Sequence, residues 1–86
     1  MTNIDALLKQ TKTLSLLYVE DNEETRTGTI ETLAIFFDEI TSAVDGQDAI
    51  EKFQAGSFDL IITDINMPKL NGIEMIKKIR VLDSHI

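Results

Sequence analysis

The feature that most constrains this chain is an apolar run at residues 58–63, Phe-Asp-Leu-Ile-Ile-Thr, which ends at a carboxylate, Asp64. A run of this length with one charged interruption is typical of a strand buried on both faces, as in parallel sheets covered by helices. Ligands of such sheets bind beyond the carboxyl ends of the strands. The pattern therefore places Asp64 where functional groups are expected. The Asn71-Gly72 pair that follows predicts a turn with positive φ before a new helix.

Two further apolar runs predict strands. The run at 14–19 also stops at carboxylates, Glu20 and Asp21. The run at 40–44 is shorter and more polar, which favours a place at the edge of the sheet.

Helical patterns separate and follow these strands. One helix is expected after Asn22, a residue type that caps helix N-termini. A second is expected after Asp45-Gly46 and ends at Gly56, and a third occupies 73–82. The apolar stripe expected on the first of these helices is Ile30, Leu33, Ala34 and Phe37. Strands and helices thus alternate, which predicts an α/β fold of right-handed, parallel βαβ units.

The length and composition limit the classes of function. The chain has 86 residues, enough for one domain, expected at 14–86 behind an N-terminal extension at 1–13 that is either a short helix or a frayed tail. A net charge of −7 opposes nucleic-acid binding and suits a site that recruits a cation. Cysteine is absent, and no apolar run approaches a membrane span, so we expect a cytoplasmic protein without membrane contact.

The acidic residues at the strand ends predict a cation site. If the first and third strands are neighbours, Glu20, Asp21 and Asp64 converge at one edge of the sheet. Carboxylates so close together raise one another's pKa unless a cation lies among them, and Mg²⁺ is the usual ion for such an oxygen site. A carboxylate can also be a nucleophile toward phosphorus, so the group is typical of a phosphoryl acceptor.

The same residues allow other interpretations. Asp64 could be a turn or capping residue, and Glu20-Asp21 a solvated loop pair. A Ca²⁺ loop is excluded because Pro68 occupies the next ligand position. A phosphatase of the haloacid dehalogenase type needs a general acid two residues after the nucleophile, and Asn66 cannot supply that proton.

Glu20-Asp21 after an apolar strand, followed by Asp64-Ile65-Asn66-Met67-Pro68-Lys69-Leu70-Asn71-Gly72, resembles the receiver domain of bacterial two-component response regulators. The resemblance covers about 14–82 and implies a partial flavodoxin-like fold with a parallel sheet of order 2-1-3 and helices on both faces.

The resemblance also implies roles for residues. Asp64 would be the phosphoacceptor, Asp21 a direct Mg²⁺ ligand and Glu20 an acid that acts on the metal through water. Asn66 matches the position whose backbone carbonyl completes the metal shell. The partner implied is a sensor histidine kinase, and the domain would be a signalling phosphoacceptor rather than a turnover enzyme.

The chain departs from the family at its end. A receiver continues with a strand ending in Ser or Thr and another ending in Lys, and this chain has neither, so the resemblance implies a receiver truncated after its third strand–helix unit. The third strand is then expected to expose an unpaired edge and apolar surface. The alternative function is a receiver remnant that is not phosphorylated and forms homodimers through that edge or through swapped elements.

Overall fold

The structure is a computed structural model that describes residues 4–65, 67, 70–83 and 86. The N-terminal helix α1 precedes three strand–helix units. The elements are α1 (Ile4–Lys12), β1 (Ser15–Val19), α2 (Glu23–Leu33), β2 (Glu39–Ala43), α3 (Gly46–Ala55), β3 (Leu60–Thr63) and α4 (Gly72–Leu82). The predicted alternation is therefore present, and the lead-in segment forms a helix rather than a frayed tail. None of the described helices has the length and apolar character that crossing a membrane requires.

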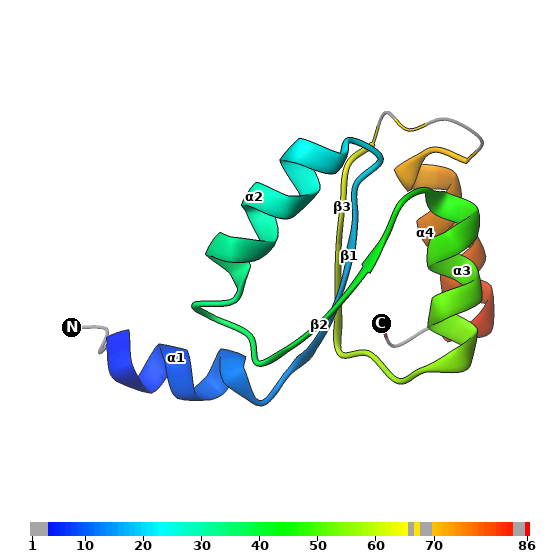
Figure 1. Cartoon of the computed structure of the whole chain (residues 1–86). Coiled ribbons are helices and arrows are strands. Elements are labelled where there is room, and N and C mark those ends of the chain that lie inside the picture. The colour runs from blue at the N-terminus through cyan, green and yellow to red at the C-terminus, as the bar shows by residue number, and fades with distance from the viewer. Residues whose placement is uncertain (1–3, 66, 68–69, 84–85) are drawn as a thin grey trace.

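The strands form a parallel sheet of order β2-β1-β3, as predicted. Leu17 in the central strand pairs with Thr41 of β2 on one side and with Ile61 of β3 on the other. Helix α2 covers one face of the sheet, and α3 and α4 cover the other (Figure 1). Because β1 and β3 run in the same direction side by side, the residues that follow them meet at one edge of the sheet.

The hydrophobic core is divided by β1, whose side chains alternate between the two faces. Leu17 and Val19 are fully buried in the cluster with Met75 and Ile79 of α4. The smaller cluster on the α2 side holds Leu16, Tyr18 and Phe37. Burial of this strand on both faces fixes the position of the residues that follow it.

The prediction that the 58–63 run is buried on both faces is wrong. Leu60 is 38% exposed and Ile62 37% exposed, and β1 is the strand buried on both sides. The physical reason is position: Ile61 packs on the α3–α4 side, so Leu60 and Ile62 face the α2 side. In the part of the chain that the structure describes, they lie at the sheet edge, outside the cluster of Leu16, Tyr18 and Phe37. The separate expectation of an exposed edge at this strand agrees with the structure.

Helix α2 is shorter than its apolar stripe predicts. It ends at Leu33, has no buried residue among its members, and leaves Ala34 exposed. Phe37 is buried, but it reaches the core from the turn beyond the helix, where its N–H and that of Phe36 both donate to the Leu33 carbonyl. Ile30 and Leu33 of α2 are partly buried against the same cluster, so the spacing identified the core-facing residues but not the end of the helix.

Candidate metal centre

Three carboxylates gather at the edge of the sheet where β1 and β3 end. One oxygen from each of Glu20, Asp21 and Asp64 lies within 4.8 Å of the others. Glu20 is only 7% exposed, whereas Asp21 and Asp64 are exposed to solvent. The structure thus brings together the three acids that the sequence placed at strand ends.

Backbone hydrogen bonds continue the sheet beyond the strands and fix these acids. The Glu20 N–H donates to the Ala43 carbonyl at 3.0 Å, and the Asp64 N–H donates to the Val19 carbonyl at 3.2 Å. Both residues are thereby held by their neighbouring strand. The loop after Glu20 ends at Asn22, whose side chain accepts from the Thr25 N–H at 2.9 Å and caps α2 as predicted.

The segment after Asp64 is closed by Asn71 and Gly72. Asn71 has φ −70° and ψ 165°, and its side chain accepts from the Glu74 N–H at 2.9 Å, so it is the N-cap of α4. Gly72 has no positive φ, and the positive-φ turn predicted for this pair is wrong. Glycine is required by close approach instead: a Cβ at residue 72 would collide with the carbonyl oxygen of Asp64. The Gly72 N–H donates to the Ile65 carbonyl at 2.9 Å.

The surroundings of Glu20 disfavour its ionised form. Burial raises the pKa of its carboxyl, and the charges of Asp64 and Asp21 raise it further. A hydrogen bond from the Asn22 backbone and the charge of Arg26 act in the opposite direction. The raised pKa means that the Glu20 carboxyl holds its proton more tightly than a carboxyl in water does.

The donor set fits a hard divalent cation. All three side chains offer carboxylate oxygens, which Mg²⁺ prefers, and two of them are open to the water that Mg²⁺ retains. Asp21 and Asp64 could bind the ion directly, and the buried Glu20 could act from behind them. Asn66, which was predicted to contribute its carbonyl, lies outside the described residues.

Arg26 is a residue of this site that the sequence analysis did not identify. Its Nη1 donates to the carbonyl oxygen of Glu20 at 3.0 Å, so a cation lies against the acidic loop. The available signal was its place four residues after the N-cap Asn22, from which a long side chain can reach back over the start of the helix.

We expect Glu20→Gln to raise the free energy of unfolding of the metal-free protein near neutral pH. Because the pKa of Glu20 is higher in the folded state than its ordinary value of 4.5, the folded state binds the proton more tightly. The ionised side chain therefore destabilises the fold progressively as the pH rises through the folded pKa, and this penalty is absent below 4.5.

Urea midpoints in EDTA at about pH 4 and about pH 7 measure this effect. The gain from Glu20→Gln should appear at the higher pH and vanish at the lower. Glu23→Gln is the control, because Glu23 is exposed in the first turn of α2, where loss of its charge should slightly lower stability. A lower urea midpoint for Glu20→Gln than for the unchanged chain at about pH 7 would contradict a raised pKa of Glu20 in the folded state.

Comparison with known sequences decides the family. The profile of the response regulator receiver domain matches residues 16–86. The chain belongs to the response regulator receiver family. It is 43% identical to the transcription factor prr1 of Schizosaccharomyces pombe over 68 residues, which are 79% of this chain and 13% of that protein.

Solved structures agree with this assignment. The chemotaxis protein CheY4 of Vibrio cholerae is 34% identical and superposes with a TM-score of 0.77 over 84% of this chain and 60% of that one. TrrA of Thermotoga maritima, in complex with Mg²⁺ and BeF, is 35% identical with a TM-score of 0.76, over 83% of this chain and 62% of that one. The same regulator in complex with histidine kinase ThkA is 33% identical with a TM-score of 0.73, over 83% and 61%.

These comparisons confirm the resemblance and the flavodoxin-like fold predicted from the sequence. The chain spans about 60% of the length of the solved receiver chains and 13% of the transcription factor.

Proposed function

We propose that this receiver domain accepts a phosphoryl group on Asp64 from the phosphohistidine of a sensor histidine kinase, in a reaction that depends on Mg²⁺. The observation that carries the proposal is the convergence of Glu20, Asp21 and Asp64 within 4.8 Å in a chain of the receiver family. The complex of TrrA with histidine kinase ThkA supports a kinase as the partner. The absence of cysteine from the sequence suits a cytoplasmic location.

The proposed step is a displacement at phosphorus. A carboxylate oxygen of Asp64 attacks the phosphorus atom, a P–O bond forms, and the P–N bond to the imidazole breaks with its electron pair left on nitrogen. A bound Mg²⁺ would supply neutralisation of the negative charge on the transferring group. Asp21 would hold the ion directly, Glu20 would hold it through water, and the carbonyl of Asn66 would complete the shell. The product is an acylphosphate that acts as a signal, so the domain is not a turnover enzyme.

Asp64 is better placed than its neighbours to be the nucleophile. It is exposed, so the phosphohistidine of another protein can reach its oxygen atoms, whereas Glu20 is only 7% exposed. Its backbone N–H donates to the Val19 carbonyl, which holds residue 64 beside the end of β1. Asp21 lies in the loop before α2 and can remain on the metal during the transfer.

A second candidate function is self-association without phosphorylation. It is favoured by the edge of β3, where Leu60 and Ile62 are exposed, and by the surface beside it, where Ile65 is 53% and Ile73 52% exposed. An unpaired strand edge with apolar flanks can pair with a second chain. The homodimer would form through this edge or through exchanged elements.

Mg²⁺ titration tests the proposed function. We expect the chain to bind Mg²⁺ in calorimetry and Asp21→Asn to weaken binding at least about tenfold, because even supporting residues of metal sites have effects of that size. Asp38→Asn makes the same charge change in an exposed residue that pairs with Lys12 across 4.0 Å, and it should bind like the unchanged chain.

The same samples separate the two candidates. No heat of Mg²⁺ binding from folded protein would contradict the phosphoacceptor proposal. A sedimentation coefficient that increases with protein concentration, equally in Mg²⁺ and in EDTA, would then favour the self-association function.

A further inference from the structure

Arg26 occupies an unexpected position for a cation beside a metal site. It lies in the first half of α2, and its half-buried side chain reaches back to the loop that joins β1 to α2. There its Nη1 donates to the main-chain carbonyl oxygen of Glu20 at 3.0 Å. Since Glu20 and Asp21 are consecutive, the Arg26 side chain holds the peptide between two of the three clustered acids.

A positive charge at this place has two opposite effects on a cation site. The Arg26 guanidinium lowers the pKa of the Glu20 carboxyl, and the same positive charge repels a metal ion bound beside that carboxyl. Its hydrogen bond, however, restrains the peptide from which both carboxylates extend. A metal site needs its ligands held in place by surrounding hydrogen bonds, and loss of such support weakens binding.

The other contacts of this loop explain why the restraint matters. The Glu20 N–H is tied to the Ala43 carbonyl of β2, and Asn22 is tied to α2 through the Thr25 N–H. These contacts secure the two ends of the loop. The carbonyl of Glu20 lies between them, and Arg26 is the group that holds it.

We propose that Arg26 is a positioning residue that orients Glu20 and Asp21 for a divalent cation, and that this role outweighs the repulsion between its charge and the cation. The inference rests on the proposed function, because it concerns the same metal site. It predicts an outcome that electrostatics alone does not: removal of a positive charge beside the site should weaken cation binding.

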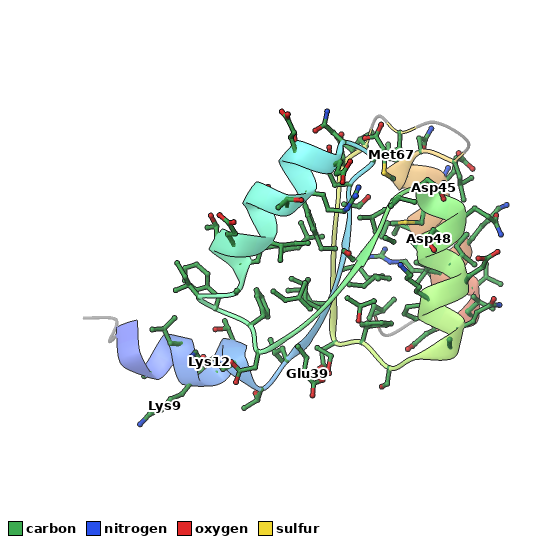
Figure 2. The ribbon with its side chains drawn as sticks, in the orientation of Figure 1. Lys9, Lys12, Glu39, Asp45, Asp48 and Met67 are labelled. Carbon is green, nitrogen blue, oxygen red and sulfur yellow. The ribbon has the colours of Figure 1, made fainter. Side chains whose placement is uncertain are left out.

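The test compares Mg²⁺ affinity in Arg26→Met, Arg26→Lys and Lys9→Met by calorimetry at low ionic strength, where effects of charge are largest. Arg26→Met should bind about tenfold more weakly than the unchanged chain. Arg26→Lys keeps a donor and the charge and should recover part of the loss. Lys9→Met makes the same charge change on α1, at the opposite end of the molecule from the carboxyl ends of the strands (Figure 2). This variant should bind Mg²⁺ as tightly as the unchanged chain or slightly more tightly.

Amide hydrogen exchange of the metal-free proteins provides a second measurement. Arg26→Met should accelerate exchange of the Glu20 amide relative to the Ala49 amide, whose N–H donates to the Asp45 carbonyl at the start of α3. A local loss of protection is expected for a positioning residue. Equal acceleration at both amides would mean general destabilisation and would overturn the inference.

The outcomes also distinguish the inference from the function on which it rests. If the unchanged chain binds Mg²⁺ and Arg26→Met binds it with equal or higher affinity, the inference alone is overturned and the proposed metal site remains. Absence of Mg²⁺ binding by the unchanged chain contradicts the proposed function, and the inference fails with it. Weaker binding in Arg26→Met, with partial recovery in Arg26→Lys and local loss of protection, supports both.

Discussion

Asp64→Asn is expected to abolish the gain of one phosphoryl group when the protein is incubated with acetyl phosphate and Mg²⁺. In this reaction a carboxylate oxygen attacks phosphorus and acetate leaves with its electron pair, so the acceptor must be a nucleophilic oxygen. An amide oxygen is too weak a nucleophile for that role. The substitution preserves the shape of the side chain and the hydrogen bond from the residue 64 N–H to the Val19 carbonyl. The fold should therefore survive.

Removal of the Asp64 charge also has a predictable effect on its neighbour. That charge helps to raise the pKa of Glu20, so the pKa should fall toward its ordinary value of 4.5 in Asp64→Asn. The variant should consequently be no less stable than the unchanged chain in EDTA. Loss of labelling in a variant of undiminished stability can be attributed to the missing nucleophile rather than to unfolding.

Intact mass spectrometry before and after incubation measures the labelling, and Asp59→Asn is the matched control. Asp59 precedes β3, at the other end of the strand from Asp64, and its carboxylate accepts from the Ser15 N–H at 2.8 Å. Asp59→Asn should still gain one phosphoryl group. A labelled Asp64→Asn protein would mean that another carboxylate accepts the group, whereas no label on the folded, unchanged chain would leave self-association as the better function.

The local features of this fold could be predicted from the sequence because they depend on neighbouring residues. Apolar runs that stop at acids gave the strands and the place of the carboxylates. Asn22 caps α2 as its side-chain chemistry predicts, and α3 begins at the predicted Asp45-Gly46 turn. The sheet order required the family resemblance, because alternation alone does not specify which strands are neighbours.

The features that were missed depend on how separate elements pack against one another, even where they are near in the sequence. The burial of Leu60 and Ile62 depends on what lies beside β3, which the composition of the run cannot reveal. The role of Gly72 depends on the approach of the Asp64 carbonyl, and Arg26 became part of the site only when the start of α2 was placed against the Glu20 peptide. Spacing identifies which residues carry chemistry but not which residues hold them in place.

Gly72→Ala is expected to lower the free energy of unfolding by about 3 kcal/mol, which for a domain of this size corresponds to a fall in Tm of roughly 12–24 °C. The added Cβ would collide with the Asp64 carbonyl oxygen and would lie 3.1 Å from the Cα of Ile65. These are backbone atoms, which cannot yield by a change of rotamer, so the first turn of α4 must separate from the end of β3. A cation site at Asp64 should weaken in the same variant.

Gly28→Ala is the matched control because it should shift stability in the opposite direction. Gly28 lies inside α2, and a Cβ there would have nothing within 4 Å. Alanine restricts the unfolded chain and favours the helix, so we expect a gain of about 0.5–1 kcal/mol. Thermal unfolding followed by circular dichroism measures both variants. Equal shifts in Tm would mean that the loss of glycine itself, rather than the space around each glycine, determines the change in stability.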